Sequence, residues 1–366
     1  MHFYEHELRA LKRANRFRER ICRDDTGVDL ASNDYLALAH SKPLLEATCK
    51  ILSSYRTHAP KASMLVNGYH PIHRAFEKAL CEANGFEEGL ILGSGFSANL
   101  ALIEALARRG DTLFIDEKFH ASGMLATRVI EANTVRFEHN CAEHLETLLK
   151  ASTATRNIVV VEGVYSMQGD LLNREIIDIA NHYGAILIVD EAHSSGVVGA
   201  RLMGIFDLYG ITVASNHIKM GTLGKAYGSF GGYILASHHI ITYLINRAKP
   251  VIYATALSLF DTLLGHQALQ YILSHAQILN EEIDRRRRIV CEYLGVEMPA
   301  LIAAVPIGSN TEALHIKEAL QREGITVGAI RPPTVDTAII RLIARLGESD
   351  ERLQFTCKFI NNFQVK

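Results

Sequence analysis

Short apolar runs alternate with amphipathic stretches between residues 89 and 190. The runs are continuous and rich in Val, Ile and Leu, and they predict strands at 90–92, 112–115, 134–137, 158–161 and 185–189. The stretches between them have helical periodicity and predict helices at 97–108, 121–130, 142–150 and 174–183. Continuous apolar strands separated by helices are covered on both faces, so the pattern predicts an α/β fold with a mostly parallel sheet.

The regions before and after this alternation have different patterns. The N-terminal region predicts an amphipathic helix at 3–20, a short strand at 28–32, a helix at 43–54 and another from Pro71. After about residue 250 the pattern predicts long helices over 256–294 and then strands near 301–306, 325–329 and 338–344. We therefore expect an N-terminal helix and arm (1–35), a large domain (36–250) and a smaller α+β C-terminal domain (251–366).

Composition narrows the function classes. The chain has 366 residues, 48% of them hydrophobic, and its formal net charge of -2 gives no electrostatic reason to expect a nucleic-acid partner. The one basic run, Arg285–Arg288, has helix-like flanks and is interpreted as a solvated helix face. The six cysteines are scattered without a Cys-x-x-Cys pair, which favours reduced thiols over disulfides or a zinc site. With no signal-like apolar segment and no membrane-spanning run, we expect a cytoplasmic protein without a membrane partner.

Lys225 is the first candidate for chemistry, because it lies in a stretch with five glycines, Gly221–Gly232. One interpretation is a glycine-rich turn that carries an ordinary lysine. The other is a lysine enclosed by close backbone, which loses water, has a lowered pKa and offers a free amine as nucleophile or base. The stretch alone leaves both open.

Other candidates follow the predicted strands, where open α/β sheets bind their ligands. Gly95 lies at the start of a helix, and the turn is either a phosphate site or a plain tight turn. His120 could stack on a flat ligand or make structural hydrogen bonds, and Ser166 could bind a ligand oxygen or serve its turn. A carboxylate at Asp190 needs a cation or a metal as partner.

His193 follows Asp190 by three residues, but third and fourth metal ligands at suitable spacing are not apparent, so no metal is predicted. The alternative is a protonated aromatic nitrogen held by Asp190. A phosphate at Gly95, a ring at His120, a ring cation at Asp190 and an aldehyde at Lys225 are together the features of pyridoxal 5'-phosphate.

Five motifs then give the chain a family resemblance. They occur in the order found in the α-oxoamine synthases, and the similarity runs from about Asn33 to Arg341. The motifs are Gly95-Phe96-x-x-Asn99, Phe119-His120-Ala121-Ser122, Glu162-Gly163-Val164-Tyr165-Ser166-Met167-x-Gly169-Asp170, Val189-Asp190-Glu191-Ala192-His193 and Thr222-Leu223-Gly224-Lys225. The resemblance implies a fold-type I, aspartate aminotransferase-like transferase that uses pyridoxal phosphate and works as a homodimer with shared active sites.

The resemblance also implies roles for individual residues. Lys225 would form the internal aldimine and move protons at the substrate α-carbon, with His120 and Asp190 completing the catalytic set. The implied cofactor contacts are backbone N–H groups of Gly95 and Phe96 and the Thr222 hydroxyl at the phosphate, His120 on the ring face, Asp190 at the ring nitrogen, and Ser166 and His193 at the phenolic oxygen. The implied substrate contacts are Arg18, Asn33 and Thr334, while Thr255 would reach the partner subunit's phosphate.

Within the family, the segment Ala329–Val335 is most similar to members of the biotin pathway. The implied reaction is decarboxylative condensation of L-alanine with pimeloyl-CoA or pimeloyl-ACP, giving an amino ketone, CO2 and free thiol. Sibling chemistries (glycine C-acetyl transfer, or 5-aminolevulinate, sphingoid-base or autoinducer-type synthesis) and a non-catalytic partner subunit are alternatives. A nicotinamide dehydrogenase is disfavoured because the dinucleotide fingerprint is incomplete.

Two departures from the family pattern concern the substrate. Met64 stands where the family usually has an arginine in a Ser-Arg-Leu loop. Near the C-terminus the chain is two residues shorter than the family pattern, so the position of the carboxylate-binding arginine aligns with Arg341 if a gap is placed and with Ile343 if it is not. We expect Arg341, because a carboxylate needs a bidentate donor, and Arg331 and Arg345 are the reserve candidates.

Overall fold

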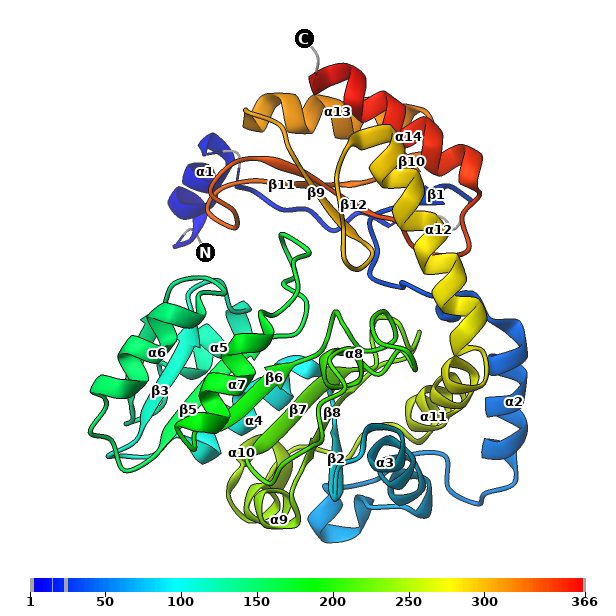
Figure 1. Cartoon of the computed structure of the whole chain (residues 1–366). Helices are drawn as coiled ribbons and strands as arrows, with labels where there is room; N and C mark the ends of the chain where they lie inside the picture. The colour runs from blue at the N-terminus through cyan, green and yellow to red at the C-terminus, as the bar shows by residue number, and fades with distance from the viewer. Residues whose placement is uncertain (1–2, 15, 23–25, 365–366) are drawn as a thin grey trace.

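The computed structural model describes residues 3–14, 16–22 and 26–364. A large part built on a seven-stranded sheet lies below a small part built on a three-stranded sheet, and helix α12 (Ala276–Leu294) runs between them (Figure 1). The ends of the predicted arm and small domain, residues 1–2 and 365–366, lie outside the described residues. Within the described ranges, none of the helices is both long and apolar enough to span a membrane.

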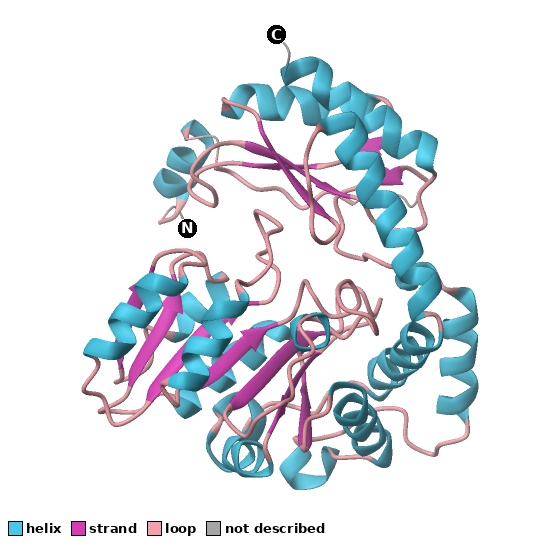
Figure 2. Cartoon of the chain, viewed as in Figure 1, coloured by secondary structure: helices cyan, strands magenta, loops and turns pink. Residues whose placement is uncertain are grey.

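The large sheet confirms the predicted α/β class (Figure 2). Its strands lie side by side in the order β2 (Glu88–Leu92), β8 (Gly232–Ala236), β7 (His217–Thr222), β6 (Ile186–Asp190), β5 (Asn157–Glu162), β3 (Thr112–Asp116) and β4 (Asn133–Phe137). Strand β8 is antiparallel to both of its neighbours, and all other pairs are parallel. Every residue of β3 and β8 is buried, as expected for strands covered on both faces.

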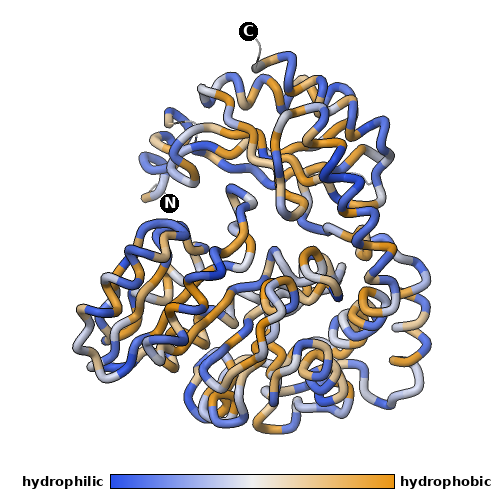
Figure 3. Tube along the Cα trace, in the orientation of Figure 1, coloured by the Kyte–Doolittle hydropathy of each residue, from blue (hydrophilic) through white to orange (hydrophobic). Residues whose placement is uncertain are grey.

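Helices pack on both faces of this sheet, and the apolar strands lie between them (Figure 3). One face is covered by α4 (Gly95–Leu106), α5 (Ala121–Ala126), α9 (His238–Arg247) and α10 (Lys249–Ile252). The other face is covered by α6 (Ala142–Ala151), α7 (Arg174–His182) and α8 (Ile205–Leu208). At the β2 edge, α3 (Pro71–Asn84) packs against β2, and α11 (Leu259–Ser274) packs against α3 and α2 (Lys42–Ser53).

The small part is an antiparallel sheet with helices on one side. Its strand order is β11 (Gly328–Ile330), β12 (Ile339–Ile343) and β9 (Ile302–Pro306), and its helices are α12, α13 (Asn310–Arg322) and α14 (Asp350–Gln364). The N-terminal arm joins it, because β1 (Val28–Asp29) pairs in parallel with β10 (Ile325–Thr326).

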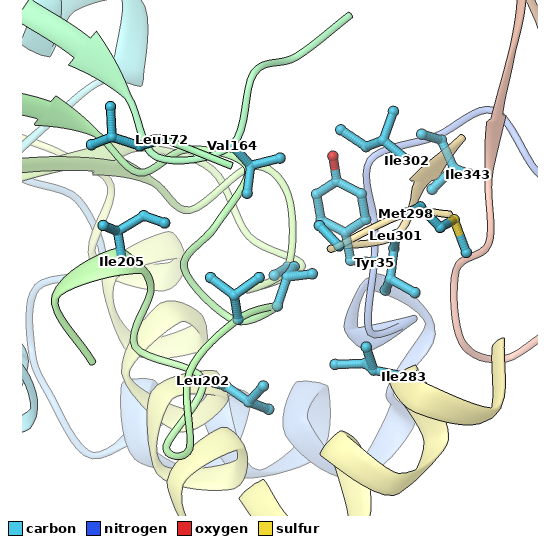
Figure 4. Close-up of a cluster of buried hydrophobic side chains, with 14 of the residues drawn as sticks. Tyr35, Val164, Leu172, Leu202, Ile205, Ile283, Met298, Leu301, Ile302 and Ile343 are labelled. Carbon is cyan, nitrogen blue, oxygen red and sulfur yellow. The ribbon is translucent and has the colours of Figure 1, made fainter. Parts of the chain in front are cut away.

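An apolar cluster fills the junction between the two parts (Figure 4). Tyr35 of the arm lies there beside Ile302 and Ile343 of the small sheet, with Val164 of the large part across from them. The arm is fixed to β12 by backbone bonds, since Ile343 N–H donates to the Leu30 carbonyl. The segment after β1 is therefore held by the small part.

Several predicted boundaries were wrong. The N-terminal helix predicted over 3–20 is only α1 (Glu5–Arg13); none of its residues is buried, so no packing extends it, residues 16–22 lack regular structure and residue 15 is not described. The helix predicted at 121–130 ends at Ala126. The strand predicted near 325–329 is two strands, because β10 pairs with β1 whereas β11 pairs with β12.

The division predicted near residue 250 stays a prediction. Helix α11 lies beyond it in sequence but packs on the large part. Two short turns complete the inventory of elements, η1 (Leu38–His40) and the π-turn η2 (Met64–Gly68).

Candidate active site

The site lies where β5, β6 and β7 end side by side. The register pairs Glu162 with Asp190 and Asp190 with Met220, so the loops that follow these strands begin at one level of the sheet. The three loops carry Ser166, His193 and Lys225. A parallel sheet thus brings together residues that are up to 59 positions apart (Ser166 to Lys225) at the carboxyl edge, where α/β sheets bind ligands.

The Lys225 amine points at His193, with Nζ 2.9 Å from Nε2. Burial lowers the pKa of Lys225 to about 8, although the nearby carboxylates of Asp190 and Glu162 favour the charged form. An appreciable fraction of this amine is therefore neutral near physiological pH and available to attack a carbonyl.

His193 is buried and lies between Lys225 and the arm, with Nδ1 2.6 Å from the Tyr35 hydroxyl oxygen. Burial, together with the positive charges of Lys225 and Arg341, holds the pKa of His193 well below its usual value. The ring is therefore neutral, with one donor and one acceptor nitrogen. The charged form of Lys225 has only hydrogens to offer Nε2, so we assign the ring proton to Nδ1, which donates to Tyr35.

Asp190 is held by two donors. Its Oδ2 accepts from Asn99 Nδ2 at 2.7 Å, and its Oδ1 accepts from the Ala192 N–H at 2.9 Å. Asn99 also donates to Ser122 Oγ at 2.9 Å, and that hydroxyl lies 2.8 Å from His120 Nδ1. The carboxylate therefore has a fixed orientation and is linked to His120 through one amide and one hydroxyl.

His120 is the N-cap of α5, where its Nδ1 accepts the Ser122 N–H at 3.2 Å. Partial removal from water lowers the pKa of His120; the Asp190 carboxylate opposes this shift and the Lys225 charge adds to it. The ring is therefore neutral at physiological pH and its orientation is fixed by the cap.

The start of α4 has the geometry of an anion site. The N–H groups of Gly95 and Phe96 precede the first helical hydrogen bonds and carry the positive end of the helix dipole. A Cβ on Gly95 would lie 3.3 Å from Thr222 Cβ, so glycine allows the Thr222 hydroxyl to lie beside these N–H groups. That hydroxyl donates to the Gly231 carbonyl at 2.9 Å. The three groups fit a phosphate.

Arg341 lies on β12 and reaches the same site from the small part. Its Nε donates to the Ser166 carbonyl at 2.8 Å and its Nη2 donates to Asn33 Oδ1 at 3.1 Å. Ile343, the other alignment, is fully buried in the apolar cluster of Figure 4. Arg345 is committed to ion pairs with Asp29 and Asp34 at 3.1 and 2.7 Å, and so it is not a free carboxylate donor.

Four other predicted residues lie outside this buried network. Arg18, Phe96, Thr255 and Thr334 are exposed, and Thr334 lies in the loop between β11 and β12. Met64 begins the π-turn η2, and its side chain is partly buried against the core on the α4 face. Met64 packs against apolar side chains, whereas the arginine that the family usually has at this position would need a polar partner there.

The structure adds polar residues that the sequence reasoning did not single out. Asn99, Ser122 and Glu162 stand inside the quoted motifs, and Glu162 also ends a strand as Asp190 does. These three residues therefore had a signal in the sequence, whereas Tyr35 had none. Glu162 Oε2 accepts the Ser166 N–H at 3.1 Å, while Oε1 has no partner among the described residues. Burial and the Asp190 charge raise the pKa of Glu162 well above its usual value.

The side chains fit pyridoxal phosphate better than a metal. Among the described residues, no three His, Cys, Asp or Glu side chains are grouped to hold an ion. The start of α4, the fixed Asp190 carboxylate and the Lys225 amine with its lowered pKa instead suit the phosphate, the ring nitrogen and the aldehyde of the cofactor.

Comparison with known proteins gives consistent results. The family described as aminotransferase class I and II matches residues 25–360. An 8-amino-7-oxononanoate synthase of Helicobacter pylori (strain ATCC 700392 / 26695) is 41% identical over 350 residues, covering 95% of this chain and 94% of the relative. One of Saccharophagus degradans is 35% identical, covering 92% and 89%.

Solved structures agree on the fold. The serine palmitoyltransferase of Sphingomonas wittichii superposes with a TM-score of 0.89 at 24% identity, covering 100% of this chain and 97% of that one. The 8-amino-7-oxononanoate synthase of Francisella tularensis has a TM-score of 0.78 at 24% identity, covering 93% and 98%. At these identities the similarity concerns the fold.

Proposed function

The chain belongs to the aminotransferase class I and II family and is a pyridoxal-phosphate-dependent α-oxoamine synthase, and we propose that it condenses L-alanine with a pimeloyl thioester. The products are 8-amino-7-oxononanoate, CO2 and the free thiol, in biotin biosynthesis. Relatives that carry this activity in their names are 35–41% identical over nearly the whole chain.

One observation carries the proposal at the level of the site: the Lys225 amine lies 2.9 Å from a neutral, buried histidine, with a fixed carboxylate at Asp190. When bound, pyridoxal phosphate supplies an electron sink for a carbanion at the amino-acid α-carbon. The phosphate would be held by the N–H groups of Gly95 and Phe96 and by Thr222. Asp190 would pair with the ring nitrogen.

We propose that the Lys225 amine takes the α-proton from the substrate and later returns it, because its pKa of about 8 suits proton transfer near neutral pH. His193 and Ser166 would contact the ring oxygen. The neutral His193 keeps its hydrogen bond to the Tyr35 hydroxyl on the other side of its ring. His120 would lie against the ring and polarise the new ketone. Asp190 and His193 are buried and Lys225 is half-buried, which limits the access of water to the reacting centre.

Arg341 is the proposed site for the alanine carboxylate. Its guanidinium is buried, held at one edge by the Ser166 carbonyl and by Asn33, and a guanidinium suits a carboxylate because it donates in a bidentate fork. Asn33, Arg18 and Thr334 are proposed contacts for the substrates.

We propose a homodimer in which Thr255 of one copy contacts the phosphate bound by the other. Support comes from apolar side chains that are exposed on segments around the site: Val66 is 78% exposed, Phe230 59% and Tyr253 80%. Large apolar side chains gathered near a site commonly mark an interface.

The proposal is tested with a matrix of amino acids against acyl thioesters, following thiol release. We expect L-alanine with a pimeloyl thioester to have the highest kcat/KM, and paired CoA and acyl-carrier-protein donors identify the carrier. A preference for glycine or for short acyl groups would show a sibling synthase. Protein that gains no visible cofactor absorbance with pyridoxal phosphate would instead be a non-catalytic partner.

A further inference from the structure

A buried ion pair lies behind the turn that carries His193. Lys219 on β7 and Glu191 directly after β6 are both fully buried, with Nζ 3.8 Å from Oε1. Lys219 also donates to Asn84 Oδ1 at 2.8 Å and to the Met203 carbonyl. Burying two charges is costly unless each is paired and hydrogen-bonded, so both residues are committed to this arrangement.

Glu191 makes hydrogen bonds to residues of its own turn and to Ile205 further along the chain. Its carboxylate accepts the Ile205 N–H at 2.9 Å and the Ser194 hydroxyl, and its backbone carbonyl accepts the Ser195 N–H at 2.9 Å. The turn between Asp190 and Ser195 contains His193. One carboxylate therefore connects this turn to residue 205.

Backbone lies close to the Glu191 carboxylate on two sides. A Cβ on Gly204 would lie 2.1 Å from Glu191 Oε2, and one on Gly163 would lie 2.9 Å from the same oxygen. The backbone encloses the group on two sides, and Leu202 and Ile205 continue into the apolar cluster of Figure 4. Any change in the Lys219 charge must therefore move the turn or leave Glu191 unpaired.

The pair lies on the sheet face away from α4. The register places Lys219 beside Val189 and Leu235, both in the core on that face, whereas Met220 belongs to the core on the α4 face. Burial lowers the pKa of Lys219, and the Glu191 carboxylate opposes this shift. Lys219 therefore reaches the site only through the Glu191 turn.

We propose that Lys219 and Glu191 are positioning residues that hold the turn from Asp190 to Ser195, which carries both Asp190 and His193, and so set how the pyridoxal phosphate ring is bound. The inference rests on the cofactor assignment of the proposed function and is independent of which amino acid and thioester react. Loss of the Lys219 charge would leave Glu191 buried without its cation and displace the turn.

Lys219→Met tests this, because methionine keeps the length of the side chain and removes the charge. We expect the dissociation constant for pyridoxal phosphate to rise about tenfold. We also expect a shift in the pH at which the visible absorbance of the bound cofactor changes, and both are measured without substrate. The matched control is Arg156→Met, which removes a pair with Asp111 (2.7 Å) at the opposite end of the sheet. The control should bind cofactor as the parent protein does.

Glu191→Gln is the second variant, since it keeps the shape and acceptor oxygen and should give the same direction of change. The double variant Lys219→Met/Glu191→Gln removes both charges and should recover part of the affinity. Parent-like affinity and pH midpoint in folded single variants would overturn the proposal. So would an Arg156→Met effect of the same size, or failure of both single variants to fold while the control folds. A parent protein that does not bind pyridoxal phosphate would instead defeat the cofactor assignment.

Discussion

The proposed cofactor side and the proposed substrate side of the site are built differently. Lys225, His193 and Asp190 follow neighbouring strands of one sheet, and each has hydrogen-bond partners within the large part or the arm. The proposed substrate side consists of Arg341 of the small sheet, the arm and exposed loops such as that of Thr334. Strand register fixes the first side locally, whereas the second depends on how separate pieces meet.

Removing the Lys225 amine should have the largest effect on the proposed cofactor side, because the reaction depends on it. Lys225→Ala is expected to lower turnover by at least about 10⁴-fold, since both the nucleophile and the proton carrier are lost. Thiol release and visible cofactor absorbance are measured together, with the exposed Lys42→Ala as control. Appreciable turnover by Lys225→Ala would show that another group carries the reaction.

Two arginines on and just after β12 separate binding from stability on the substrate side. Arg341→Ala should raise the KM for the amino acid about 100-fold, because a buried charged donor is removed, while cofactor affinity stays unchanged. Arg345→Ala should instead lower thermal stability, as its partners Asp29 and Asp34 are left unpaired. An unchanged KM in Arg341→Ala would remove this residue from substrate binding.

Asn99 tests whether the orientation of Asp190 matters to the cofactor side. Asn99→Ala removes the 2.7 Å bond to the carboxylate and the link to Ser122, and we expect cofactor affinity to fall about tenfold. Equilibrium titration with pyridoxal phosphate measures it. Asn173→Ala, which removes only the N-cap of α7, is the control for general loss of stability.

The pH dependence of cofactor association distinguishes the Lys225 amine from an ordinary lysine. Because burial lowers the pKa of Lys225 to about 8, the neutral fraction rises with pH and is nearly complete a little above pH 9. The association rate of cofactor-free protein should therefore rise more than about tenfold between pH 6.5 and 8 and level off above pH 9, as followed by stopped-flow absorbance. A rate that still rises steeply above pH 10 would mean an unperturbed amine.

His139 gives the smallest effect and lies away from both sides. Burial alone would lower the pKa of His139, but hydrogen bonds to Asp116 and Asp170 raise it to about 9. A raised folded-state pKa contributes stability that is fully present below about pH 6.5 and is lost as pH rises through 9. His139→Gln should thus lower the free energy of unfolding by about 1–2 kcal/mol at pH 6 and by less at pH 9.5, in denaturant titrations. Equal losses at the two pH values would contradict this.

The same contrast explains what the sequence could predict. Continuous apolar runs identified β3, β4, β5 and β6, and Asp190 was found because the strand end itself is the signal. Strands β7 and β8 were not predicted, and Lys225 was found from the glycines around it. Family membership, the pyridoxal phosphate cofactor and the α/β fold are confirmed by the relatives and the solved structures.

Long-range geometry was not predictable from local pattern. Tyr35 looks like an ordinary apolar position in sequence, yet its hydroxyl meets His193, 158 positions later. Alignment without a gap gave Ile343, and Arg341 was preferred because a carboxylate needs a bidentate donor. The structure adds that Ile343 is buried in the apolar cluster, whereas Arg341 donates to Ser166 and Asn33. The N-terminal helix was overextended because amphipathic periodicity does not reveal whether a core is present to receive it.

The arm packs against the small part, which lies at the other end of the sequence, and this affects the order in which the protein folds. The contact between Asn33 and Arg341 spans 308 positions, and closing so long a loop is slow because its entropy is lost before the contact forms. The large sheet needs only residues 88–236, so during synthesis it can condense well before β12 leaves the ribosome. We expect a nascent chain to form its proposed cofactor pocket first and the proposed amino-acid binding site at Arg341 last.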